Sequence, residues 1–213
     1  MKSMRFSLIF ILLILASLAC FSTSAQSTPS NILFSDDFSN TDNKWDQVTE
    51  STRSSDYYNN AYRITVNDTN SDAWANPGSE SFTDVQIEVD ATKNSGPDDN
   101  DFGIICRYTD VDQFYYGVVS SDGYYGIMKM TSDGGMPIGS DSLLESDKII
   151  QGDASNHIRF DCVGSTLTLY VNSTQVDQQT DSTYTTGNVG LIAGTFDTAG
   201  TDVLFDNLFV YKP

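Results

Sequence analysis

Basic side chains are scarce in this sequence of 213 residues. It carries 11 Lys and Arg residues against 29 Asp and Glu residues, which gives a formal net charge of −18 at pH 7. Proteins that bind nucleic acids gain most of their affinity by neutralising phosphates with positive side chains, so DNA and RNA are excluded as partners. The negative charge also opposes adsorption to an anionic lipid surface, so any attachment to a membrane has to be covalent or hydrophobic.

Cysteine and histidine are scarcer still, with three cysteines and one histidine in the whole chain. This count excludes a disulfide-dense secreted scaffold and leaves too few ligands for a typical zinc site. A Ser-His-Asp hydrolase would have to use His157, but the sequence contains no G-x-S-x-G motif, so we expect a surface histidine. Cys106 and Cys162 lie at inward positions of expected strands. Two free buried thiols are the expectation, and a disulfide is left open because the strand pairing is unknown.

No apolar run is long enough to cross a membrane as a helix, which needs about 20 apolar residues. The longest run, Phe6 to Leu18, has thirteen nearly uninterrupted apolar residues and follows the basic residues Lys2 and Arg5. A short positive segment followed by an apolar run of this length is typical of a signal peptide. The sequence therefore predicts an exported protein.

The end of the apolar run offers a lipidation site. Ala19 and Cys20 close the run, and a small residue directly before a cysteine resembles the lipobox of bacterial lipoproteins. The resemblance implies a signal peptide over residues 1–19 and acylation of Cys20. Residues 20–30 would then be a flexible polar tether, and the membrane would be reached through the N-terminal lipid only. The alternative is cleavage after Ala25, which gives a secreted protein instead of a membrane-anchored lipoprotein of the cell envelope.

Helical periodicity is absent from residue 31 onward, and apolar and polar residues alternate instead. The alternation is clearest over residues 62–67, 85–90, 158–162 and 167–172. It predicts strands with one buried and one solvent-exposed face, separated by Gly-, Asn- and Asp-rich turns. With no repeat or second linker, residues 31–213 are expected to form a single all-β domain, a jelly-roll sandwich of two antiparallel sheets. Residues 113–119 are apolar on both parities, so their inward face cannot be assigned.

Several segments carry a resemblance to a known fold family, namely residues 34–38, 102–108, 114–116, 156–159, 167–172, 189–193 and 205–210. Together they resemble the concanavalin A-like lectin/glucanase jelly rolls, and within them the subgroup of bacterial envelope proteins and the 3-keto-disaccharide hydrolase domain family. The resemblance covers nearly the whole expected domain. It implies the fold more strongly than the function, because this scaffold hosts lectins, glycosidases and plain interaction modules.

The glycosidase motifs of this fold are incomplete here. Glu88 and Asp90 share one strand face, as in the E-x-D-x-E strand of laminarinase-type enzymes, but Thr92 and Lys93 occupy the positions of the second glutamate. In the 3-keto-disaccharide hydrolase family an Asn-Ser-Gly strand is common. The Asn-Ser-Gly at residues 94–96 is expected in a turn instead, out of register with that strand. We therefore do not expect an enzyme, and a glycoside-type hydrolase is the second interpretation.

Acidic clusters suggest a structural calcium ion, which takes roughly six to eight oxygen ligands. Asp37 lies on the expected first strand and Asp206 on the last, and these two strands pair in many jelly rolls. We expect Asp37 and Asp206 to be the metal ligands if calcium is present. Residues 98–101 form a second acidic cluster, and neither cluster has the spacing of an EF-hand.

Sugar binding uses aromatic rings flanked by polar side chains. The candidate ligand-binding residues are Trp74, Arg107, Tyr116, Tyr125 and Lys129. If the two basic side chains point outward, acidic polysaccharides are the first ligands to test, with neutral β-glucans beside them. The sequence thus predicts a membrane-tethered glycan-binding module of the cell envelope. A structural or adhesive surface domain without a small ligand is the third interpretation.

Overall fold

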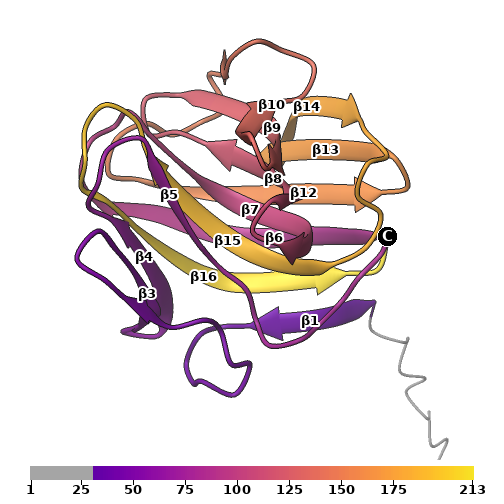
Figure 1. Cartoon of the computed structure of the whole chain (residues 1–213), viewed down its shortest axis with the longest axis horizontal. Helices are drawn as coiled ribbons and strands as arrows, with labels where there is room; N and C mark the ends of the chain where they lie inside the picture. The colour runs from indigo at the N-terminus through magenta and orange to yellow at the C-terminus, as the bar shows by residue number, and fades with distance from the viewer. Residues whose placement is uncertain (1–30) are drawn as a thin grey trace, which may run out of the picture. The chain divides into compact units, whose positions relative to one another are not determined.

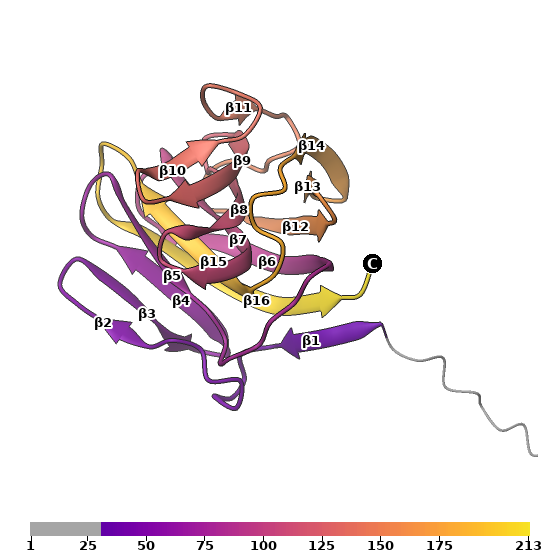
Figure 2. The same ribbon diagram turned by 45° about the vertical axis from the view of Figure 1, so that its right-hand side comes forward.

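Strands make up all the regular secondary structure of residues 31–213, which are the part of the chain that the computed structural model describes. The expected signal peptide, the tether and the acylation site Cys20 lie outside the described residues. Within residues 31–213 no helix is long and apolar enough to cross a membrane. The strands form two antiparallel sheets that lie face to face as two layers (Figures 1 and 2).

The larger sheet has nine strands, and its order begins with β14, β13, β12, β6 and β16 and continues with β4, β3 and β2. Their bounds are Thr174–Thr180 for β14, Thr166–Val171 for β13, Ser155–Val163 for β12, Val85–Ser95 for β6, Thr201–Tyr211 for β16, Ala61–Val66 for β4, Arg53–Tyr58 for β3 and Val48–Thr49 for β2. The first strand, β1 (Ile32–Asp36), pairs with the C-terminal part of β16, as expected from the sequence. Figure 1 shows β1 beside β16 near the C-terminus.

The smaller sheet has seven strands in the order β10, β9, β8, β7, β15 and β5, with β11 paired to β9. Their bounds are Gly134–Pro137 for β10, Tyr124–Thr131 for β9, Gln113–Val119 for β8, Asn100–Asp110 for β7, Asn188–Thr195 for β15, Ser71–Ala75 for β5 and Leu144–Glu145 for β11. These two sheets confirm the expected all-β jelly-roll sandwich.

Alternation of side chains builds the core between the two sheets. In β4, Tyr62, Ile64 and Val66 are fully buried while the residues between them stay partly exposed. The same period continues in β6 and β12, because successive side chains of a strand point to opposite faces. Phe102 of the seven-stranded sheet and Phe160 of the nine-stranded sheet are among the largest side chains that the core encloses.

A disulfide joins the sheets across this core. It links Cys106 of β7 to Cys162 of β12, whose Cα atoms are 6.7 Å apart. The inward parity expected for both cysteines is confirmed, but the expectation of two free thiols is wrong. The sequence does not show that β7 and β12 lie opposite each other in facing sheets, and this arrangement is what brings the two sulfur atoms together.

Candidate functional site

A second apolar cluster lies on the outer face of the seven-stranded sheet, away from the core. Its buried members are Ile105, Phe114, Tyr116, Val118, Met130 and Ile192, and its partly buried members are Trp74, Tyr108, Met128 and Leu143. Apart from Leu143, which lies between β10 and β11, they belong to β5, β7, β8, β9 and β15, and those outside the bulge of β7 are opposite in parity to the residues of the core. Residues 113–119 are therefore apolar on both parities because β8 contributes one face to the core and the other to this cluster.

Four aromatic side chains of this cluster form a connected layer, which we call the aromatic layer: Trp74, Tyr108, Phe114 and Tyr116. The ring of Phe114 lies 5.5 Å from that of Trp74, 5.5 Å from that of Tyr108 and 5.6 Å from that of Tyr116, measured between centroids. Phe114 and Tyr116 are buried, whereas Trp74 and Tyr108 keep part of their surface exposed. Trp74 and Tyr108 therefore offer aromatic surface to solvent, and the buried rings of Phe114 and Tyr116 complete the layer.

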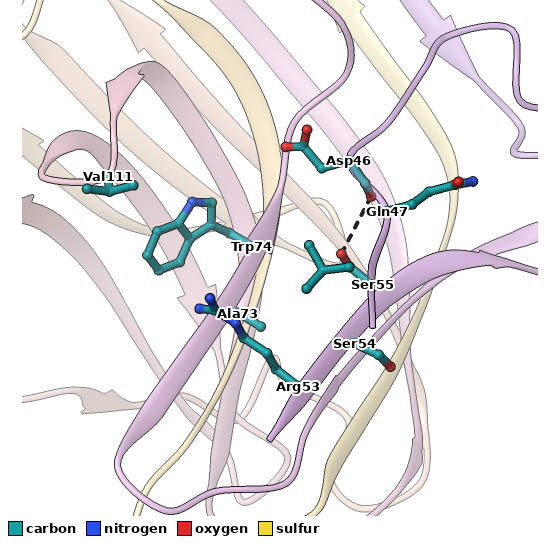
Figure 3. A pocket seen from close by; sticks show the side chains of 9 residues that line it. Asp46, Gln47, Arg53, Ser54, Ser55, Ala73, Trp74 and Val111 are labelled. Carbon is teal, nitrogen blue, oxygen red and sulfur yellow. Dashed lines mark hydrogen bonds between the residues drawn. The ribbon is translucent and has the colours of Figure 1, made fainter. Parts of the chain in front are cut away.

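A cavity of about 270 Å³ opens beside Trp74, and we call it the Trp74 cavity. It lies where the free edge of β5 meets β2 and β3, and its lining includes Asp46, Arg53, Ser55 and Val111. Figure 3 shows the indole ring directed toward Val111, with the Arg53 side chain reaching toward Ala73. One edge of the aromatic layer is therefore accessible from the side.

A larger cavity of about 660 Å³, which we call the Tyr124 cavity, lies toward the other edge of the sheet. It is lined by Asp99, Ser120, Asp122, Tyr124, Met128, Pro137, Ser142, Leu143 and Phe196. The Tyr124 hydroxyl donates to Glu145 Oε1 at 2.8 Å. Leu143 packs on Gly126 of β9, where a Cβ atom would lie 2.5 Å from Leu143 Cδ2. The chain after β10 thus folds over β9 and forms a wall of the cavity.

Two carboxyl groups meet on the same outer face, and we call them the carboxyl pair. Asp72 of β5 and Asp101 of β7 both pair with Gly194 of the intervening strand β15. Oδ1 of each occupies space that a Cβ atom at position 194 would need, so the glycine lets them converge. Neither carboxyl group makes a hydrogen bond or ion pair with another residue of the described chain. Burial raises the pKa of Asp72 to about 6, and burial followed by the charge of Asp72 raises the pKa of Asp101 well above its ordinary value.

The structure brings together two of the five predicted ligand-binding residues. Trp74 and Tyr116 both belong to the aromatic layer. The Tyr116 hydroxyl lies against Gly135 of β10, where any side chain would collide with it. Burial, and then the charges of Asp72 and Asp101, raise the pKa of Tyr116. Its phenol therefore stays protonated and can donate a hydrogen bond.

The other three predicted residues lie away from this face. The condition that Arg107 points outward is not met, because a bulge with a φ of 55° at Arg107 turns the side chain inward. It is 2% exposed and donates to the carbonyl oxygens of Thr83 (3.2 Å) and Tyr184 (2.9 Å). Lys129 binds Asp181 at 2.7 Å, and Tyr125 packs against the main core.

Sequence reasoning missed Asp72, Tyr124 and Phe196, and it considered Asp101 only within the acidic cluster 98–101 as a possible calcium site. A signal was present for Asp72, because it precedes Trp74 by two residues and so shares its face on any strand. Asp101 and Tyr124 can be placed on the outer face only when it is known which side of β7 and β9 points to the core, and the sequence alone does not provide this. Phe196 follows the end of β15, and only the folded chain places it in the Tyr124 cavity.

The motifs considered for hydrolysis lie elsewhere. Glu88 and Asp90 are on the nine-stranded sheet, where Asp90 Oδ1 binds His157 Nδ1 at 2.8 Å. His157 lies on the surface at 40% side-chain exposure. Asn94 and Ser95 end strand β6 instead of lying in a turn, and both donate to Asp202. These residues are part of the sheet structure and do not contribute to the aromatic layer.

The predicted calcium ligands lie at the junction of β1 and β16. The charge of Asp37 contributes to the raised pKa of Asp206, after burial and the charge of Asp90. In the described part of the chain no group of three or more His, Cys, Asp or Glu side chains is arranged to hold a metal ion. Calcium binding at Asp37 and Asp206 stays a prediction that needs backbone or water ligands as well.

We expect calcium, if it binds there, to raise the melting temperature and a chelator to lower it, because a ligand of the native state stabilises that state. Differential scanning calorimetry of the native protein and of Asp206→Ala measures this. The variant should lose the response while keeping its fold. If neither calcium nor a chelator changes the melting temperature of the native protein, the site is removed from consideration.

No protein-family model matches this chain, and no curated protein matches it in sequence. Solved structures do match. The carbohydrate-binding module CBM66 from Bacillus subtilis has a TM-score of 0.63 and 17% identity over 79% of this chain and 95% of that one. A Bacillus licheniformis β-glucanase has a TM-score of 0.59 and 10% identity over 84% and 98%. A Bacteroides ovatus mixed linkage glucan GH16 protein in complex with its product has a TM-score of 0.57 and 12% identity over 84% and 100%. These similarities show a concanavalin A-like jelly-roll fold.

Proposed function

We propose that the domain is a glycan-binding module and that it binds its ligand on the outer face of the seven-stranded sheet. The observation that carries this proposal is the aromatic layer, with carboxylates beside it and a cavity toward each edge of the sheet. A sugar ring has apolar faces that stack on aromatic side chains, and its hydroxyl groups need hydrogen-bond partners. Partly exposed Trp74 and Tyr108 supply the aromatic surface, and the carboxyl pair supplies acceptors.

The comparisons support this proposal at the level of the scaffold. Similar solved structures include a protein named as a carbohydrate-binding module, one named as a β-glucanase and one named as a mixed linkage glucan GH16 protein. Because a fold does not fix a function, the argument for this chain depends on its own outer face. Arg107 and Lys129 are engaged with protein groups, so the reason for placing acidic polysaccharides first no longer holds.

A Trp74→Ala variant should bind glycans about tenfold more weakly than the native protein, because it removes the exposed ring of the aromatic layer. A glycan array followed by titration calorimetry on any hit measures the change. The matched control is Tyr58→Ala, which removes an exposed ring from the nine-stranded sheet and should bind normally. If the native protein binds no glycan, the structural or adhesive interpretation is favoured. If both variants bind like the native protein, the site lies elsewhere.

A glycoside-hydrolase function is the second candidate, and the carboxyl pair favours it. Two facing carboxyl groups with raised pKa values can hold one proton between them, which is the state that a general acid and a nucleophile or base require. Release of reducing sugar from a bound glycan, abolished by Asp101→Asn, would establish hydrolysis. If the native protein binds a glycan but releases no reducing sugar from it, hydrolysis is contradicted and the binding function is kept.

We also propose that the protein is exported and anchored through acylated Cys20, on the sequence evidence given above. In cells, the native protein should partition into the detergent phase and Cys20→Ala into the aqueous phase. Substitution of a neighbouring residue, Ser22→Ala, is the control and should leave the partition unchanged. Equal partition of the native protein and Cys20→Ala into the aqueous phase would contradict the anchor and favour secretion.

A further inference from the structure

The charged side chains around the Tyr124 cavity are acids. Asp99 and Asp122 line it, and the described chain contributes no basic side chain to its lining. Burial, then the charges of Asp122 and Asp197, raise the pKa of Asp99. Asp101 of β7, two residues after Asp99 in the preceding loop, extends this acidic region to the carboxyl pair. Lys93, a basic residue close in sequence to Asp99, is already paired, because it binds Asp98 and Asp153.

Asp101 is largely buried, but its carboxyl oxygens are not among the fully enclosed unpartnered atoms of the described residues and therefore keep some contact with solvent. Its side chain is 8% exposed, and no described residue donates a hydrogen bond to its carboxyl group. A carboxylate removed from water without a donor is costly, so buried carboxylates are normally paired. Asp72 Oδ1 and Asp101 Oδ1 both converge over Gly194, on the face that carries the aromatic layer, because the glycine has no Cβ atom to hold them apart. A donor that enters from outside would meet two acceptors at once.

The number of acceptors favours an ammonium group over a metal ion. A calcium ion needs roughly six to eight oxygen ligands, and no group of three or more acidic, histidine or cysteine side chains in residues 31–213 is arranged to hold a metal. An ammonium group carries three N–H donors, so two carboxylates and one further acceptor satisfy it. Hydrogen bonds between an ammonium and a carboxylate are also stronger than neutral ones.

We propose that the carboxyl pair and the adjoining Tyr124 cavity bind a sugar unit that carries a free ammonium group, as glucosamine does. The inference rests on the glycan-binding function proposed above and specifies its ligand class. The rings of Tyr124 and Phe196 line the cavity and offer stacking surface for the sugar. An amino sugar places its charge directly on the ring, so one unit can contact the aromatic side chains and the carboxylates together.

The test compares three trimers of equal length: glucosamine, N-acetylglucosamine and glucose joined by β-1,4 bonds. Titration calorimetry at neutral pH and physiological ionic strength limits long-range attraction to the acidic protein. The native protein should bind the glucosamine trimer about tenfold more tightly than the other two, which is the difference between a charge-assisted and a neutral hydrogen bond. Asp101→Asn should abolish this preference, so that the variant binds the charged trimer no more tightly than the two neutral trimers. Asp133→Asn, an equal charge change in the exposed β9–β10 turn, should preserve it.

The outcomes separate this inference from the proposed function. Equal affinity of the native protein for charged and neutral trimers overturns the amino-sugar assignment and leaves glycan binding intact. Binding of none of the trimers, together with no hit on the glycan array, overturns both. A lysine tripeptide that binds as tightly as the glucosamine trimer would show a general site for cations and would overturn the assignment to a sugar. Equal loss of preference in Asp133→Asn would show that net charge alone is responsible.

Discussion

A variant in which Cys106 and Cys162 are both replaced by alanine should unfold with a free energy about 4 kcal/mol smaller than that of the native protein. The disulfide closes a loop across a sequence separation of 56 residues, and the loss of such a cross-link releases chain entropy in the unfolded state of about this size. Domains of this kind are stable by only about 5–15 kcal/mol, so the loss is a large part of the total. Urea unfolding followed by tryptophan fluorescence measures it.

Reduction of the native protein is the matched control, because it opens the bond without changing side-chain volume. A reducing agent should lower the unfolding midpoint of the native protein and leave that of the double alanine variant unchanged. If reduction and substitution both leave the midpoint where it was, the cross-link is absent or contributes nothing to stability. If substitution alone lowers it, the cost comes from lost packing around the two buried sulfur atoms.

The second large effect is a dependence of stability on pH that originates in the carboxyl pair. Burial raises the pKa of Asp72 from 3.8 to about 6 in the folded protein. Between these two values the folded state holds more protons than the unfolded state, so the free energy of unfolding falls as the pH rises. A shift of this size corresponds to roughly 3 kcal/mol lost between pH 4 and pH 7, and Asp101 adds to it.

Replacing both carboxyl groups, Asp72→Asn with Asp101→Asn, should flatten this part of the profile and make the variant more stable than the native protein at pH 7. The exposed Asp133→Asn variant should keep the native profile. Asp181 and Asp202 act in the opposite direction. Burial alone would raise their pKa values, but several hydrogen bonds together outweigh it and lower them, with the bond from Lys129 largest for Asp181 and the bond from Arg63 largest for Asp202. Their stabilisation is lost only below about pH 4, the ordinary range of a carboxyl group, so the two effects occupy different pH windows. A double variant with unchanged stability at pH 7 would contradict the prediction.

Much of the fold was predictable because it depends on local alternation. The period-two pattern of β4, β6, β12 and β13 gives both the strand type and the buried face, and turn residues mark their ends. Pairing between distant strands does not follow from local pattern. For this reason the sequence did not resolve whether Cys106 and Cys162 form a disulfide, although it assigned the correct inward parity to each.

The candidate site was less predictable because it depends on which of two apolar faces points outward. Tyr115 and Tyr116 are equally aromatic, yet Tyr115 packs in the core and Tyr116 lies in the aromatic layer. Arg107 was misplaced because a single bulge reverses the side-chain direction that alternation predicts. The carboxyl pair forms because β5 and β7 flank β15, and these three strands are far apart in the sequence. Only the glycine between them, Gly194, leaves room for the pair.

The pairing of the first strand with the last decides how the domain responds to tension. The backbone N–H of Lys212 donates to the carbonyl of Asn31 at 2.8 Å, and β1 runs antiparallel to β16 from this point. Both ends of the folded domain therefore lie at the same end of one strand pair. A pulling force applied between them acts across the strands and breaks their hydrogen bonds one after another, starting at Lys212. The domain should yield by peeling of β1 at low force, with the disulfide-linked core unaffected until β16 follows.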